Sequence, residues 1–212
     1  MESVIIEEMR AFLRLDLNPR QHKYFTDTID VAKRVEVVPV SEVFNEREIE
    51  LIRRIVRPEK QACYKNAHLL TLLFSDRVQY CEGKTLAIIP IDHAFNRVGD
   101  KYVDITFEMA LKDDGFTGYE YVVFGEYPAG VIETITEQTG YYGEIYRYCY
   151  CAEQMALEKD TPGNPKGTTG GAVRSNRERY LVMRYCKDML KILLSNAPRK
   201  NDFQNKGFIF GN

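Results

Sequence analysis

The chain has 212 residues, of which 44% are hydrophobic and 28% are charged, and its formal net charge is −2 at pH 7. This length suffices for one well-cored domain with an appendage, or for two small domains, and the composition is that of an ordinary globular protein. A charge so close to zero gives no electrostatic reason to expect nucleic acid or an anionic membrane as a partner.

The N-terminus and the cysteines indicate an intracellular protein. Residues 1–8 lack the basic start and the apolar core of a signal peptide, and no uninterrupted apolar stretch approaches membrane-spanning length. The five cysteines, at positions 63, 81, 149, 151 and 186, are odd in number and scattered, so no complete disulfide framework follows. We therefore expect a cytoplasmic location, reduced thiols and no membrane partner.

Helices are expected at both ends of the chain and strands between them. Apolar residues recur near helical spacing in residues 2–15, more weakly in 20–34, and again in 45–57. A further helix should carry Cys63, because Ala67, Leu70 and Leu73 follow it near helical spacing and Pro58 closes the preceding segment.

Strands are predicted at residues 77–81, 93–98, 101–107 and 119–124, and helices at 130–138, 144–159 and 176–195. Helices, then antiparallel strands, then helices indicate the α+β class. We expect one domain over residues 1–212. Its parts would be a helical N-terminal extension over about 1–58, a core over about 59–127 and a helical C-terminal part over about 128–212.

Cys63 is the candidate nucleophile. A cysteine in the first turn of a helix lies at the positive end of the helix dipole, which favours the thiolate over the thiol. The unpaired backbone N–H groups of that turn can also receive an oxyanion.

His93 and Asp104 are the candidate base and the group that orients it. Gly99 and Asp100 read as a two-residue turn between two short strands, so that Val98 faces Lys101. In this register His93 faces Thr106, and Asp104 lies diagonally two positions away on the same face, within reach of the imidazole. A cysteine nucleophile needs this combination of an imidazole and an orienting carboxylate.

Several spaced motifs resemble the papain-like superfamily in its transglutaminase-like branch. They are Cys63-Tyr64-x-Asn66, Tyr80-Cys81-Glu82-Gly83, Pro90-x-x-His93-Ala94-Phe95 and Asp104-x-Thr106. More narrowly, they resemble a group of short uncharacterised bacterial and phage proteins, over roughly residues 60–145. The resemblance implies a Cys-bearing helix packed on a small antiparallel sheet. Phe95 stands where Trp is usual and Ile105 where Pro is common, and we interpret both as packing variants.

Three neighbours of Cys63 are supporting candidates. The side-chain amide of Gln61 would assist the backbone N–H of Cys63 in an oxyanion hole, although papain-like enzymes place their glutamine further upstream. Tyr64 adjoins the nucleophile, and Asn66, one turn along the helix, is expected to tie down the neighbouring loop. The chemistry uses side chains alone, so we expect no cofactor and no metal.

Other candidates are weaker. Cys81 is the rival nucleophile, but it ends a predicted strand and lacks a helix dipole. His68 lies about 140° around the helix from Cys63, which does not suit a base. Cys149 and Cys151 point to different sides of a helix, and no second Cys/His pair with zinc spacing accompanies them.

Two functions remain open at this stage. The first is acyl transfer at an amide of a protein or peptide, by hydrolysis or by transfer to an amine. The second is a catalytically inactive module that binds a protein partner, for example in a phage particle, through its helical extensions and its tail at residues 198–212. The Gly- and Pro-rich segment 160–171 is expected to be a surface loop, and a lid if it folds over the thiol.

Overall fold

The structure is a computed structural model and describes residues 3–112 and 118–160. The chain divides into two compact units, Met1–Cys149 and Tyr150–Asn212, and the features below belong to the first unit unless stated otherwise. The expected helix at 176–195, the loop at 160–171 and the tail at 198–212 lie outside the described residues, apart from Asp160, the last residue of a helix. The expectation of one domain over 1–212 stays a prediction.

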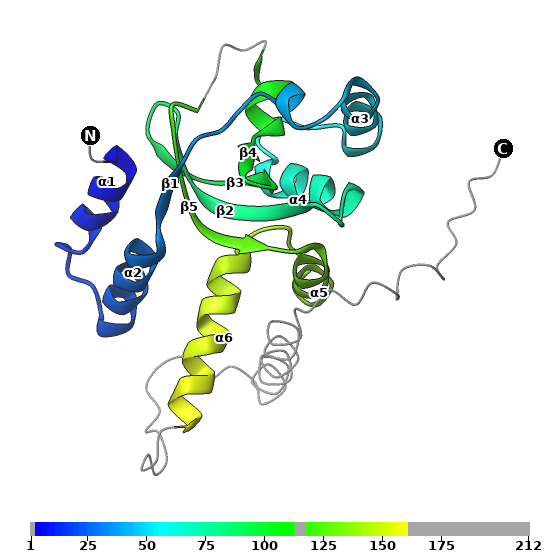
Figure 1. Ribbon diagram of the computed structural model, residues 1–212. Coiled ribbons are helices and arrows are strands. Elements are labelled where there is room, and N and C mark those ends of the chain that lie inside the picture. The colour runs from blue at the N-terminus through cyan, green and yellow to red at the C-terminus, as the bar shows by residue number, and fades with distance from the viewer. Residues whose placement is uncertain (1–2, 113–117, 161–212) are drawn as a thin grey trace. The chain divides into compact units, whose positions relative to one another are not determined.

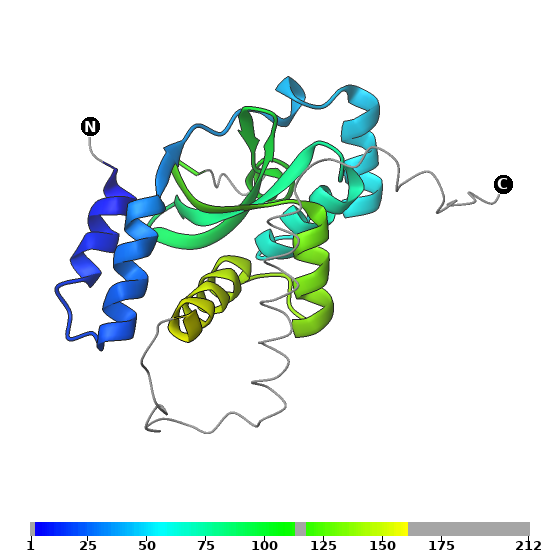
Figure 2. The ribbon, with the colours of Figure 1, turned by 60° about the horizontal axis from the view of Figure 1, so that its bottom comes forward.

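The first two helices are set by their N-terminal caps. Helix α1 (Val4–Phe12) begins after Ser3, whose hydroxyl accepts a hydrogen bond from the backbone of Ile6 at 3.1 Å. Helix α2 (Pro19–Val31) begins with a capping box between Asn18 and Gln21. The two helices lie side by side in both views of the ribbon (Figures 1 and 2).

A short strand, β1 (Lys33–Val35), follows α2 where the sequence predicted helix up to residue 34. The chain then forms η1 (Val40–Glu42), α3 (Glu46–Leu51) and the π-helical turn η2 (Ile52–Val56). The helix predicted at 45–57 is therefore confirmed, with a change of helix type at Ile52.

The sheet is antiparallel and curled. Its strands are β1, β2 (Val78–Leu86), β3 (Pro90–Val98), β4 (Lys101–Val103) and β5 (Glu120–Tyr127). They pair in the order β1-β5-β2-β3-β4. The chain after β1 also reaches the opposite edge, because Val37 bridges to Tyr102 and the backbone N–H of Val38 donates to the Tyr102 carbonyl at 2.8 Å. The predicted α+β class is confirmed.

Apolar cores lie on both faces of this curled sheet, and one of them joins α1 and α2 to β5 through Ile5, Met9 and Val122. Inside the curl, residues from several strands pack together: Cys81, Phe95, Tyr121 and Val123, with Val35, Val37 and Tyr102 against them. Helix α4 (Cys63–Leu73) lies on the outer face of β2 and β3. Beneath it is a second core of Val40, Phe44, Ile52, Val56, Leu70, Val78, Val103 and Ile105.

Two further helices complete the described chain. Helix α5 (Ala129–Thr139) ends at Gly140, whose φ of 75° lies in the left-handed region that favours glycine. Helix α6 (Ile145–Asp160) begins in the first unit and extends into the second. Both match helices expected from the sequence.

Gly83 marks a close approach of β2 and β5. The pairing of these strands is irregular between Glu82 and Gly83, and a Cβ at Gly83 would lie 1.9 Å from the carbonyl oxygen of Val122. Two strand backbones that come so near leave no room for any side chain.

We predict that Gly83→Ala lowers the free energy of unfolding by about 1–3 kcal/mol or more, because β5 must move away from β2. Urea denaturation measures the change. Gly130→Ala is the matched control, since a Cβ there meets nothing within 4 Å and Ala is the better helix former. Equal stability of the Gly83→Ala variant and the native chain would contradict the prediction.

Candidate active site

Cys63 is the first residue of α4, as the sequence predicted. Its thiol is half-buried, and no side chain of the described residues caps the helix by a hydrogen bond. The first intrahelical bond runs from the N–H of Asn66 to the carbonyl of Ala62 at 2.8 Å. The backbone N–H groups of residues 63–65, in the first turn of α4, are therefore not used within the helix.

His93 and Asp104 form a buried ion pair. The distance from His93 Nε2 to Asp104 Oδ2 is 2.6 Å, and the side chains are 3% and 2% exposed. Cys63 lies near the same imidazole, since it contributes, after Asp104, to raising the pKa of His93. The structure thus brings the three predicted catalytic residues together.

The hairpin that carries His93 and Asp104 is confirmed in its turn and register but not in its length. Val98 pairs with Lys101 and Asn96 with Val103, as expected from the Gly99-Asp100 turn. The strand predicted over 101–107 ends at Val103, and the π-helical turn η3 (Thr106–Ala110) follows.

The early end of β4 has a physical cause in Asp104. Its Oδ1 accepts hydrogen bonds from the backbone N–H groups of Thr106 at 2.9 Å and Phe107 at 3.2 Å. A carboxylate that binds the N–H groups two and three residues ahead starts a helical turn instead of extending a strand.

The pKa of His93 is governed by opposing influences. Burial by itself lowers it, but the charge and hydrogen bond of Asp104, and then those of Cys63, raise it to about 10. The imidazolium form is thus retained at neutral pH. The stabilisation that the charged ring contributes is fully present below its ordinary value of about 6.5 and is lost as pH rises through about 10.

Aromatic rings enclose the His93 imidazole. The ring centroid of Phe107 lies 5.1 Å away, that of Tyr121 6.3 Å and that of Phe95 6.4 Å. These rings keep water from most of the imidazole, so the ion pair lies in a medium of low dielectric constant, where its charges interact more strongly than in water.

Asn66 joins the nucleophile helix to the segment of Asp104. Its amide Nδ2 donates to Thr106 Oγ1 at 3.0 Å and to the carbonyl of Glu59 at 2.8 Å, and its Oδ1 accepts from the N–H of Glu59 at 3.1 Å. Asn66 therefore ties down the loop before α4, as expected, and also fixes α4 against η3.

Tyr64 and Gln61 lie beside the nucleophile in different settings. Tyr64 is half-buried, and its pKa is raised, first by burial and then by the charges of Glu82 and Asp92. Gln61 is exposed and has a φ of 60° in the left-handed region. The role of Gln61 in an oxyanion hole stays a prediction.

Glu82 is a buried carboxylate of the motif Tyr80-Cys81-Glu82-Gly83, and the motif itself does not indicate its role. It accepts hydrogen bonds from the Tyr80 hydroxyl at 2.8 Å and from the N–H groups of Ile145 at 2.9 Å and Tyr146 at 2.8 Å, at the start of α6. Burial raises its pKa, and these three hydrogen bonds oppose that effect.

The loop before α6 packs near the nucleophile because of this carboxylate. The Tyr80 hydroxyl also donates to the carbonyl of Tyr142 at 3.2 Å. A Cβ on Gly143 would lie 2.8 Å from the Tyr64 ring, so the loop is in direct contact with that ring. Glu82 therefore holds one wall of the site next to Cys63.

The alternative candidates for the nucleophile and the base, Cys81 and His68, have the surroundings of residues that pack in a core. Cys81 is fully buried, and its pKa is raised, first by burial and then by the charge of Glu126. His68 is buried between the rings of Tyr80 and Tyr142, and burial lowers its pKa to about 4. Neither residue is paired with a catalytic partner in the manner of Cys63 and His93.

Among the described residues no cluster of His, Cys, Asp and Glu side chains could hold a metal ion. Cys149 is buried and Cys151 is exposed. Cys186 lies outside the described part of the chain, as does the basic cluster of Arg174, Arg177, Arg179 and Arg184.

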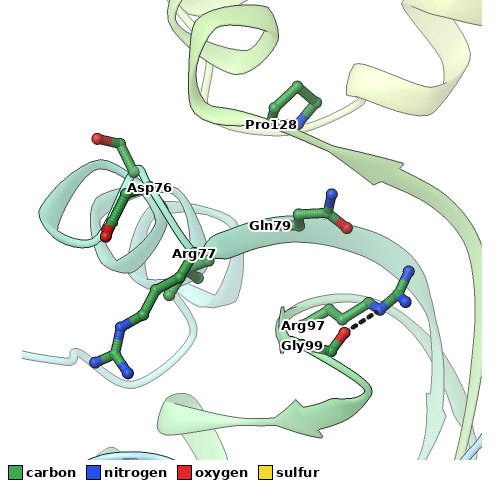
Figure 3. Close-up of a pocket in the computed structure, with 8 residues that line it drawn as sticks. Asp76, Arg77, Gln79, Arg97, Gly99 and Pro128 are labelled. Carbon is green, nitrogen blue, oxygen red and sulfur yellow. Dashed lines mark hydrogen bonds between the residues drawn. The ribbon is translucent and has the colours of Figure 1, made fainter. Parts of the chain in front are cut away.

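A pocket of about 260 Å³ lies at the other end of β3, away from His93 (Figure 3). Its polar lining includes Gln79 and Arg97, and the Arg97 Nε donates to the Gly99 carbonyl at 2.8 Å. Arg97 also pairs with Glu126 at 2.6 Å. Arg97 and Arg77, which pairs with Glu48, are thus bound to carboxylates of the protein, and Asp76 is the other charged residue of the lining.

No family model, curated protein or solved structure matches this chain. Within residues 3–112 and 118–160, no helix combines the length and the apolar character needed to cross a membrane. The candidate site is therefore interpreted from the positions and contacts of its own residues.

We predict that Glu82→Gln lowers the free energy of unfolding by about 1–3 kcal/mol. The amide retains one acceptor oxygen and turns an NH2 group toward a backbone donor at the start of α6. Thermal unfolding followed by circular dichroism measures the loss. Glu59→Gln is the control, because its side chain forms only an exposed pair with Lys65, worth less than about 1 kcal/mol. Similar losses in the two variants would refute the role given to Glu82.

Proposed function

We propose that this protein is a cysteine-nucleophile enzyme that transfers an acyl group from an amide, with Cys63, His93 and Asp104 as its triad. One observation supports the proposal most: the imidazole of His93 is bound by Asp104 at Nε2, and Cys63 lies close enough to raise the pKa of the same ring. The proposed nucleophile, base and orienting group thus follow one another in space in the order that such chemistry requires.

In the proposed reaction the Cys63 thiolate attacks the amide carbonyl carbon, and the carbonyl oxygen becomes an oxyanion. Protonated His93 then gives its proton to the amine as the carbon–nitrogen bond breaks, which leaves a thioester on Cys63. Water or a second amine attacks the thioester, and His93 accepts the proton of this nucleophile. The carbon–sulfur bond breaks, the acyl product leaves, and the thiolate–imidazolium pair is restored.

The oxyanion would be bound at the start of α4. The backbone N–H of Cys63 lies in the turn that no side chain of the described residues caps, and the helix dipole adds favourable charge there. The amide of Gln61 is the proposed second donor. An exposed residue next to the nucleophile is free to turn toward a bound substrate.

The substrate proposed is a peptide bond, a glutamine side chain or an isopeptide in a protein or peptide. The papain-like, transglutaminase-like core inferred from the motifs agrees with this class, because both branches act on such amides. Incorporation of an added primary amine into the product separates transfer from hydrolysis.

The proposal predicts an unusually reactive Cys63. Iodoacetamide alkylation at each cysteine, followed by peptide mass spectrometry between pH 5 and 9, measures this directly. Below pH 7 we expect Cys63 to react at least about tenfold faster than the exposed Cys151, because the thiolate is stabilised by imidazolium and helix dipole. Cys81 serves as the buried, unreactive reference.

His93→Ala should remove the advantage of Cys63, and Asp104→Asn should reduce it by misorienting the imidazole. Circular dichroism establishes that each variant is folded. A Cys63 that reacts like Cys151 in the native chain and in both variants would overturn the enzyme proposal. The alternative, an inactive member of the fold that binds a protein, would then be preferred, since a buried His–Asp pair also stabilises a core.

A further inference from the structure

Tyr121 makes a hydrogen bond across the interior of the curled sheet to the triad. Its hydroxyl donates to Asp104 Oδ2 at 3.0 Å, the same oxygen that binds His93 Nε2 at 2.6 Å. Strand β5, which carries Tyr121, is separated from β4 by β2 and β3 in the sheet order, so this contact depends on the curl.

The position of the Tyr121 hydroxyl is tightly restricted. Tyr121 is 6% exposed, and a Cβ on Gly118 would lie 2.2 Å from its hydroxyl oxygen and 2.7 Å from Thr85 Oγ1. The main chain at Gly118 thus lies directly against the hydroxyl. Burial, followed by the charge of Asp104, raises the pKa of Tyr121, so the group stays a hydrogen-bond donor at physiological pH.

We propose that Tyr121 is a positioning residue of the triad, whose hydroxyl shares Asp104 Oδ2 with His93 and thereby sets the strength of the His93–Asp104 hydrogen bond. The proposal rests on the proposed function and extends it to a residue that the sequence motifs did not identify as part of the site.

The physical argument concerns a shared acceptor. A carboxylate oxygen that already accepts one hydrogen bond is a weaker acceptor for the next, and the hydroxyl dipole places positive charge near the imidazolium. The other oxygen, Oδ1, is held by the backbone N–H groups of Thr106 and Phe107, so the carboxylate keeps its place without Tyr121. Removing the hydroxyl should therefore strengthen the bond to His93 rather than release it.

Few groups compete with Tyr121 in setting the pKa of His93, so a change in that pKa can be assigned to it. Three titratable groups face the imidazole: Asp104 after β4, Cys63 on α4 and Tyr121 on β5. The other ring neighbours, Phe95 and Phe107, are uncharged.

The test is Tyr121→Phe, which removes the hydroxyl and keeps the ring. The titration of the His93 ring is followed by NMR between pH 6 and 11, and Cys63 alkylation is followed over pH 5–9. We expect the His93 titration to move upward by about half a pH unit or more, and the Nε2 proton to move downfield. Cys63 alkylation in this variant shows whether the thiol keeps its His93-dependent reactivity.

Tyr102→Phe is the matched control. The Tyr102 hydroxyl donates to Glu126 at 2.7 Å, and its ring packs in the same interior core, against Phe95. This variant loses an equivalent tyrosine–carboxylate bond that does not reach His93. It should leave the His93 titration unmoved.

A second substitution covers the case in which Tyr121→Phe does not fold. Replacement of Tyr121 by 3-fluorotyrosine keeps the shape and makes the hydroxyl a stronger donor, so the His93 titration should move downward. Shifts in opposite directions for the two variants support the proposal. An unmoved titration in every folded Tyr121 variant overturns it.

The two proposals fail in distinguishable ways. If native Cys63 shows its His93-dependent reactivity while Tyr121→Phe leaves the His93 titration unchanged, the role of Tyr121 is wrong and the enzyme proposal stands. If native Cys63 reacts as an ordinary thiol, the enzyme proposal is wrong. The role of Tyr121 as a positioning residue of a catalytic triad is then wrong with it, whatever the His93 titration shows.

Discussion

The buried carboxylate of Asp104 is the interaction on which the arrangement of the site depends. It accepts four hydrogen bonds, which come from the His93 ring, the Tyr121 hydroxyl and the backbone of Thr106 and Phe107. These donors belong to β3, β5 and η3, so a single side chain fixes a strand, a distant strand and a helical turn together. A charge that is 2% exposed is tolerated because four hydrogen-bond donors replace the water that the carboxylate loses on burial.

Other carboxylates in the fold also accept hydrogen bonds from backbone N–H groups at the starts of helices. Glu82 binds the first N–H groups of α6, and Glu120 at the start of β5 accepts from the Ser3 hydroxyl and the Ile5 N–H at the start of α1. Glu108 accepts from the N–H of Val40 at 2.7 Å, at the start of η1. Carboxylates thus attach several helices at their positive ends, where the orphan N–H groups need partners.

Much of the site could be predicted because its signals are local. The helical spacing after Cys63 and the Gly99-Asp100 turn each lie within a few residues, and both predictions are confirmed in position and register. The end of β4 was missed although Asp104-x-Thr106 carries a capping signal, since strand-forming residues surround it. Tyr121 and Glu82 bind partners 17 and 63 residues away, and no local pattern encodes such contacts. Strand β1 was missed because three residues are too few for a periodic pattern.

Cys63 and His93 are carried by elements that pack on different cores: α4 covers the core that includes Leu70, and β3 contributes Phe95 to the core inside the curled sheet. The Asn66–Thr106 hydrogen bond is one of the few polar links from the nucleophile helix to the segment of Asp104. A small slide of the helical layer over the sheet would lengthen the sulfur–imidazole distance while both cores stayed intact. In the proposed enzyme, activity would therefore be lost when the two layers slip out of alignment, before either core unfolds.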